Sequence, residues 1–376
     1  MAYPRIPQVF PLRAVSALVL LIVVAASVAQ CTTRPDPGRT AAASPTAATA
    51  ARAAQALSPV GATPGAGATA TASAAATGPP GSPAGLAATA TPPPPTAAPA
   101  TPTAPPEAHP VLPAGILDPT NGPLRHNRLV TFYGHPFSDK MGVLGEYQPD
   151  EMVRRLKEQA DLYTKADPTR PAIPTIELIA SVAQASPGPD GLFLQRTPPA
   201  IIEQYAQLAE KNNMLLLLDI QIGRGTVAAD IRAIEPYLKR PYVHLAIDPE
   251  FAVKPGQVPG DEFGSIDASD IIGAARTLAD VVTQNGITDK VLLVHQFVPS
   301  MITNKQLLKP MPHVEIVLNV DGFGSAKVKK DDYRLLVTDE PIQYGGMKLF
   351  YKQDDPLMAP EEVLALTPSP VVVIFQ

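Results

Sequence analysis

The sequence of 376 residues contains no tryptophan and only one cysteine, Cys31. A single cysteine cannot form a disulfide bond within the chain, and its place near the N-terminus leaves the later residues without a cysteine nucleophile. No Gly-x-Ser-x-Gly motif occurs, so the chain offers no serine placed for acyl-transfer chemistry. The lack of tryptophan leaves only tyrosine and phenylalanine rings to contact a sugar face.

The chain contains slightly fewer basic than acidic residues. The chain has 30 lysine and arginine residues against 35 aspartate and glutamate residues, which gives a formal net charge of −5. No block of basic residues occurs between residues 111 and 376. Because nucleic-acid binding requires a basic surface, we expect no nucleic-acid partner. The composition does not indicate an oligomeric state.

The first 31 residues have the features of an export signal. Arg5 and Arg13 precede an uncharged apolar stretch over residues 14–29, and Gln30 and Cys31 follow it. A basic start, a short apolar core and a small-residue exit predict export, and the core is short for a membrane-spanning helix. The run Val28-Ala29-Gln30-Cys31 resembles a bacterial lipoprotein signal, although Gln30 replaces the usual small residue. This resemblance implies that Cys31 is lipidated, with palmitate among its acyl chains. It also implies that the lipid holds the protein on the extracytoplasmic face of the cell membrane. An uncleaved anchor or an ordinary secretory signal is the alternative.

Residues 32–110 are composed mainly of alanine, threonine, proline, serine and glycine. Such a segment has too little apolar side-chain surface to offset the entropy lost on ordering, so we expect a disordered linker. Its prolines favour extended conformations. The linker would carry a folded domain away from the membrane.

Residues 111–376 alternate between apolar runs and helical patterns. The runs predict eight buried parallel strands: Arg128–His135, Ile173–Ala180, Met214–Gln221, Tyr242–Glu250, Lys290–Phe297, Val314–Asp321, Met347–Gln353 and Pro370–Gln376. The helical patterns cover Pro149–Thr164, Pro198–Asn212, Val227–Leu238 and Ala268–Gln284, with shorter ones at Thr303–Leu308, Lys329–Val337 and Pro360–Leu366. Eight such units predict an α/β fold, a (β/α)8 barrel of the TIM type.

The pattern departs from a complete barrel at its end, because no helix follows the eighth strand. Val111–Leu117 could cover the gap that this leaves. An open doubly wound sheet is the competing fold, and the lack of a glycine-rich phosphate turn after the first strand disfavours it. Long strand-to-helix loops and short helix-to-strand loops favour a barrel with its site at the carboxyl ends of the strands.

Polar side chains gather at those strand ends. Because side chains alternate between faces, Asp248 and Glu250 share the side of the fourth strand that also carries His244 and Ala246, which we expect to face the barrel interior. The same reasoning selects as catalytic candidates Glu250, Asp248, Asp219 and Asp321. The candidates for substrate binding are Tyr133, His135, Glu177, Gln221, His295, Gln296, Tyr351 and Lys352. Only one of His295 and Gln296 can point inward, because they are neighbours in one strand.

Two carboxyl groups held together can divide their roles, one staying ionised while the other supplies a proton, as glycosidic bond cleavage requires. The Asp248-Pro249-Glu250 sequence resembles the strand end of chitinase-type glycoside hydrolases and barrel-type muramidases. The resemblance implies that Glu250 is the general acid and that Asp248 orients an acetamido group of the substrate. Ala246 and Pro249 depart from the chitinase motif.

Two other functions stay open. The barrel could bind a carbohydrate or a cell-envelope partner without cleaving it, and the lack of tryptophan and the incomplete motif favour this function. The linker followed by a barrel is also similar to the arrangement in other bacterial lipoproteins. A metal-dependent hydrolase would draw its ligands from His135, Asp219, Asp248, His295 and Asp321. The first strand lacks the His-x-His of amidohydrolases and the His-Arg of glycerophosphodiesterases. We therefore expect a glycan substrate, no cofactor and no metal.

Overall fold

The structure is a computed structural model that describes residues 109–376. The predicted export signal with Cys31, and the linker up to residue 108, lie outside the described residues. Within residues 109–376, no helix is long and apolar enough to cross a membrane.

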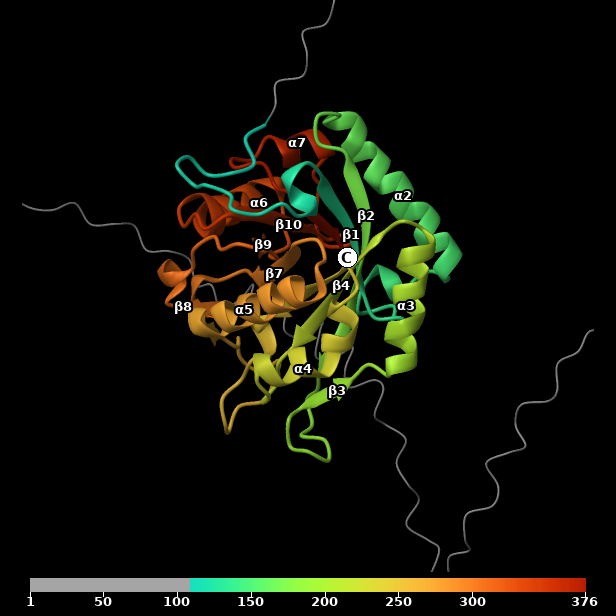
Figure 1. Ribbon diagram of the computed structural model, residues 1–376, viewed down its shortest axis with the longest axis vertical. Helices are drawn as coiled ribbons and strands as arrows, with labels where there is room; N and C mark the ends of the chain where they lie inside the picture. Colours follow the sequence, from blue (N-terminus) through green and yellow to red (C-terminus); the bar gives the residue numbers. More distant parts are fainter. Residues whose placement is uncertain (1–108) are drawn as a thin grey trace, which may run out of the picture. The chain divides into compact units, whose positions relative to one another are not determined.

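Eight parallel strands close into a barrel (Figure 1). They are β1 (Arg128–Gly134), β2 (Ala172–Ala183), β4 (Leu215–Gln221), β5 (Val243–Asp248), β7 (Lys290–Gln296), β9 (Val314–Val320), β10 (Tyr344–Leu349) and β11 (Val372–Phe375). Strand β1 pairs with both β2 and β11, which closes the sheet. The predicted (β/α)8 barrel is confirmed, and the open doubly wound sheet is wrong. A short strand, β3 (Leu194–Arg196), pairs antiparallel with the last residues of β2.

The strands are buried on both faces, and alternate residues enter two different apolar clusters. One cluster lies between the strands and the helices and includes Phe132, Leu218 and Ile247. The other fills the barrel interior and includes Leu217 and Val317. This two-sided burial explains why the strands read as almost continuous apolar runs in the sequence.

The four long amphipathic helices all precede β7 in the chain and cover the outer face of the barrel. They are α2 (Pro149–Ala166), α3 (Pro199–Lys211), α4 (Val227–Leu238) and α5 (Ala268–Asn285), all at predicted positions. Later helices are short: α6 (Ala326–Tyr333) runs into a π-turn, η6 (Arg334–Thr338), and α7 (Pro360–Leu364) precedes β11. Single 3-10 turns lie at η1 (Pro123–Arg125), η2 (Val143–Gly145), η3 (Pro249–Phe251), η4 (Pro299–Met301) and η5 (Lys305–Leu307).

The predicted helix at Thr303–Leu308 is wrong. The chain forms a short strand, β8 (Ile302–Thr303), which pairs with β6 (Ile266–Asp267), and then the 3-10 turn η5. Asn304 adopts a left-handed backbone conformation with φ of 55°, and its side chain donates to the Asp267 carboxylate. The left-handed Asn304 and its contact with the distant Asp267 leave room only for the 3-10 turn, where the sequence predicted a longer helix.

The N-terminal part of the described chain closes the end of the barrel at which the strands begin. Val111 and Leu112 pack against the interior cluster, and Leu124 belongs to it. The Leu124 backbone N–H donates to the Glu315 carboxylate, and that of Asn121 donates to Asp289. Val111–Leu117 therefore packs in part against the interior rather than over the outer face as a substitute for an eighth helix, and Leu117 is exposed.

Candidate functional site

A cavity opens at the carboxyl ends of the strands, where a (β/α)8 barrel carries its chemistry. It contains about 610 Å³ of empty space, part of it open to solvent. Its polar lining consists of Tyr133, Lys140, Gln221, Asp248, Glu250, Asp321, Lys348 and Gln376. Its apolar lining consists mainly of Met141, Ile179, Phe251, Phe297, Phe323 and Phe350. The cavity combines acidic groups with aromatic walls.

Two of the predicted catalytic carboxyl groups are adjacent in this wall. Strand β5 ends at Asp248, and Glu250 lies in the turn η3, so the prediction that the strand continues to Glu250 is wrong. Pro249 has no N–H to donate to a neighbouring strand, and the Asp248 carboxylate accepts the Glu250 N–H at 3.0 Å, which starts the turn. The turn still directs both carboxyl groups to the cavity.

The environment of Glu250 favours its neutral form. The residue is only 8% exposed, and its Oε1 has no hydrogen-bond partner among the described residues. Burial raises the pKa of Glu250 well above the ordinary value, and the Asp248 charge adds to this effect. Burial also raises the pKa of Asp248. Burial therefore favours the protonated form of this pair.

Asp321 has the opposite environment. It follows β9, and its carboxylate accepts hydrogen bonds from Lys348 Nζ at 3.1 Å and from Asn319 Nδ2 at 2.6 Å. His295 Nδ1 lies 2.9 Å from both of its oxygens. Although burial opposes ionisation, the His295 and Lys348 charges lower the pKa of Asp321 below its ordinary value. Asp321 is thus an ionised carboxylate on the same cavity as Glu250.

A second layer of polar side chains lies deeper in the barrel. Tyr133 donates its hydroxyl to Asp219 Oδ2 at 3.4 Å, and Gln221 Nε2 donates to the Tyr133 oxygen at 3.4 Å. The Lys348 ammonium lies 3.7 Å from the centre of the Tyr133 ring. Burial raises the pKa of Asp219 well above its ordinary value. Tyr133 and Gln221 thereby connect the cavity to the buried carboxyl group of Asp219.

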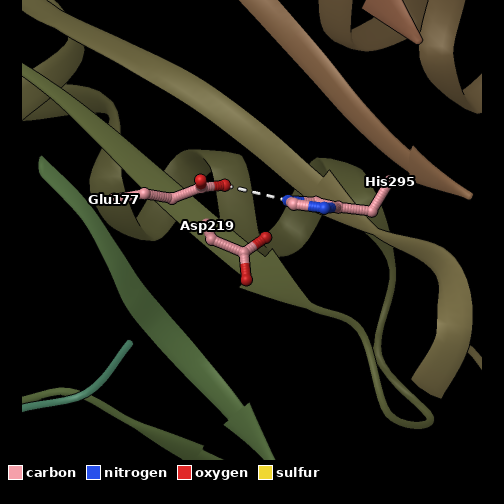
Figure 2. Close-up of side chains that lie close together, drawn as sticks. All are labelled: Glu177, Asp219 and His295. Atoms are coloured by element: carbon pink, nitrogen blue, oxygen red, sulfur yellow. Dashed lines mark hydrogen bonds and ion pairs between the residues drawn. The ribbon is translucent and has the colours of Figure 1, made fainter. Parts of the chain in front are cut away.

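Glu177, Asp219 and His295 converge in this layer from β2, β4 and β7 (Figure 2). Donor atoms of the three side chains lie within 4.8 Å of one another. His295 Nε2 lies 2.8 Å from Glu177 Oε1, and each of the two carboxyl groups keeps one buried oxygen without a partner among the described residues. This donor set is of the kind that binds a divalent metal.

His295 lies between two carboxylates, Glu177 at one ring nitrogen and Asp321 at the other. Burial opposes a charge on the ring, but Asp321 and Glu177 together raise the pKa of His295 well above its ordinary value. The neighbouring residue, Gln296, points away from the interior, where its Nε2 donates to the Leu336 carbonyl in η6. His295 is therefore the inward member of the predicted pair, and Gln296 does not reach the cavity.

Three other predicted substrate-binding residues lie away from the cavity. His135 contacts the Thr197 hydroxyl at 3.0 Å, and burial lowers its pKa to about 4. Tyr351 stacks on Phe375 and donates to Gln159. Lys352 pairs with Glu146 near the surface.

The position of Lys352 follows from where β10 ends. The strand covers Tyr344–Leu349 rather than the predicted Met347–Gln353. Lys348, rather than the predicted Lys352, is consequently the interior lysine. Its signal was present, since it is a lone charged residue within an apolar strand.

Comparisons with known proteins identify no family. No family model matches the chain, and no curated protein matches it. Among solved structures, the chain is similar to a candidate alpha-L-fucosidase from Bacteroides thetaiotaomicron VPI-5482, with 10% identity and a TM-score of 0.34. This match covers 70% of the present chain and 88% of the other. A likeness of this size carries no argument about activity.

Proposed function

We propose that the barrel is a glycoside hydrolase in which Glu250 acts as the general acid. The observation that carries this proposal is the pair of adjacent buried carboxyl groups, Asp248 and Glu250, which line one cavity. Glu250 lines the cavity, and its Oε1 has no hydrogen-bond partner among the described residues, so a proton on that side chain can be donated to a ligand rather than to the protein.

Glycosidic cleavage requires a proton for the leaving oxygen and negative charge near the developing positive ring. Glu250 supplies the first, because its neutral form is favoured. Asp321 supplies the second, since Lys348 and Asn319 hold its carboxylate by hydrogen bonds. Asp248 positions Glu250 by accepting its backbone N–H. Asp219 supports the site through its contact with Tyr133.

The cavity walls support a carbohydrate as the substrate. Phe297, Phe323 and Phe350 offer apolar rings to the C–H faces of a sugar, which partly replaces the missing tryptophan. Gln221 and Gln376 offer amide groups to hydroxyls. The cavity is partly open to solvent, which lets a short glycan end enter it.

We further propose that this activity is extracytoplasmic. The support is the lipoprotein-like sequence at Cys31 and the length of the linker that follows it. A lipid at Cys31 would hold the barrel near cell-envelope glycans.

The variant Glu250→Gln tests the catalytic role. We expect the full chain to cleave members of a panel of aryl glycosides and oligosaccharides, and the variant to lose about 10²–10⁴-fold in kcat on substrates with poor leaving groups. The loss should be smaller for dinitrophenyl glycosides, whose leaving group needs no proton. Glu262→Gln is the matched control, because Glu262 is exposed in the same loop. Binding of glycans without any turnover by the native chain would refute the proposal, as would full activity of Glu250→Gln.

A further inference from the structure

The interior of the barrel holds more acidic than basic groups. Four buried carboxyl groups, Glu177, Asp219, Asp248 and Glu250, lie there together with the partly exposed Asp321, beside one lysine, Lys348, and one histidine, His295. A buried charge without a partner is energetically costly. An excess of carboxyl groups is therefore stable only if some of them are protonated or if a cation binds to them.

Three of these carboxyl groups keep a buried oxygen without a partner among the described residues, and two of the three lie beside one histidine. Glu177 Oε2 and Asp219 Oδ1 are both buried without a hydrogen-bond partner among the described residues, and both side chains are 0% exposed. Figure 2 shows these two carboxyl groups and the His295 ring turned toward one another from three different strands. Apart from Glu250 Oε1, the unpartnered carboxyl oxygens found among the described residues of this group therefore lie on the two side chains that converge with an imidazole.

From this convergence we propose that Glu177, Asp219 and His295 bind a divalent transition metal, with zinc as the preferred ion. Donors at about 2.0–2.2 Å from a tetrahedral zinc ion lie roughly 3.3–3.6 Å apart. The three donor atoms already lie within 4.8 Å of one another, so small side-chain movements bring them onto one ion. Three protein ligands leave a further coordination position for water or substrate.

The second side of the His295 ring fits this role. Ligand histidines generally donate their other ring N–H to a carboxylate, which fixes the tautomer and ring orientation. Asp321 occupies that place, since His295 Nδ1 lies 2.9 Å from its oxygens while Nε2 faces Glu177. With a metal bound, His295 is neutral, Nε2 coordinates the ion and Nδ1–H donates to Asp321. Lys348 and Asn319 continue to hold Asp321.

The mixed donor set selects the metal. Imidazole together with carboxylates suits zinc, whereas magnesium and calcium prefer sites made wholly of oxygen donors. The site does not depend on the glycoside hydrolase proposal. Bound metal can be counted without any assay of cleavage, so either proposal can fail alone.

The test uses the full chain, stripped with a chelator, desalted, and then given Zn²⁺, Mg²⁺ or Ca²⁺ singly. We expect about one zinc ion per chain after gel filtration, measured by mass spectrometry, and a rise in Tm with zinc. Magnesium and calcium should bind at least tenfold more weakly. A folded chain that retains no zinc and shows no rise in Tm would overturn the proposal.

Variants locate the bound ion. Glu177→Gln and Asp219→Asn should each lower zinc affinity by more than about tenfold, and Asp321→Asn by about 10–100-fold through loss of the second hydrogen bond of His295. Glu315→Gln is the matched control, a buried carboxyl group at the other end of β9, and should leave the affinity unchanged. Circular dichroism shows whether each variant is folded. If Glu177→Gln or Asp219→Asn does not fold, Asp321→Asn tests the proposal in its place. Unchanged zinc affinity in the folded ligand variants or in Asp321→Asn would place the ion elsewhere and overturn the proposal.

Discussion

Lys348 shows how much one residue can organise at the centre of this barrel. Its ammonium donates to Asp321 and lies over the ring of Tyr133, and the side chain is buried. Burial disfavours its charge, but Asp321 and Glu177 raise its pKa above the ordinary value. A lysine in this position balances part of the acidic charge of the site. Without it, Asp321 would lose one of its two cationic partners.

We therefore predict that Lys348→Met destabilises the protein by up to about 3–5 kcal/mol, because it removes one of the two cationic partners of the Asp321 carboxylate. Urea unfolding followed by circular dichroism measures the change. Lys352→Met is the matched control, since Lys352 forms an exposed pair with Glu146, and it should cost less than about 1 kcal/mol. Equal effects of the two substitutions would show that Lys348 is not an essential charge partner.

Side-chain alternation predicted several interior residues of the site but not all of them. It correctly assigned Asp219, Asp248 and Asp321 to one region, because they lie at or just after strand ends whose limits the sequence marks well. It misplaced Lys352 because β10 begins and ends earlier than its apolar run indicates. Glu250 reaches the cavity through a turn, which alternation in a strand cannot describe. Wrongly predicted strand ends thus led to wrongly predicted site residues.

At the scale of elements, the start of α5 is tied to a distant loop by one side chain. Asp267 is the N-cap of α5 and accepts the Ser269 N–H at 3.0 Å. The same carboxylate accepts hydrogen bonds from Thr303 and Asn304, which lie in the connection between β7 and β9. These hydrogen bonds, led by that from the Ser269 N–H, lower the pKa of Asp267. The contact replaces the helix that the sequence predicted in this connection.

We predict that Asp267→Ala lowers Tm by a few degrees, because it removes the helix cap and the link to the loop together. Differential scanning calorimetry measures the shift. Asp280→Ala, an exposed substitution later in the same helix, should leave Tm almost unchanged. A Tm for Asp267→Ala equal to that of the control would contradict this role.

The strands and the long helices could be predicted from the sequence, whereas the connection between β7 and β9 could not, and the difference has a physical reason. The strands and the helices α2 to α5 carry long apolar patterns because each buries a whole face. The connection between β7 and β9 is short and depends on the Asp267 contacts, which join residues far apart in the sequence. No local pattern encodes such a contact.

At the scale of the whole barrel, polarity changes along its axis. The cavity end is acidic, and an apolar layer that includes Leu217, Leu293 and Val317 lies in the interior. A further buried acid, Glu315, lies where β9 begins. Glu315 accepts the Leu124 N–H at 3.1 Å and so holds the N-terminal segment against the barrel. Burial raises the pKa of Glu315 to about 8 from its ordinary value of 4.5.

This shift makes the closed end of the barrel sensitive to pH. The folded state binds the Glu315 proton more tightly than the unfolded state, so the contribution to stability is fully present below pH 4.5 and declines as pH rises toward 8. At about 1.4 kcal/mol for each unit of pKa difference, the decline amounts to a few kcal/mol.

Glu315→Gln removes the titrating group but keeps an oxygen that can accept the Leu124 N–H. We predict that the variant resembles the native protein in its free energy of unfolding near pH 5 and becomes the more stable of the two by pH 8.5, because only the native residue must then bury a negative charge. Urea unfolding of both proteins across this range measures the difference. A difference that stays constant with pH would mean that Glu315 does not control the stability of this end. A growing difference would connect one buried acid to the closure of the whole barrel, at the end opposite its candidate site.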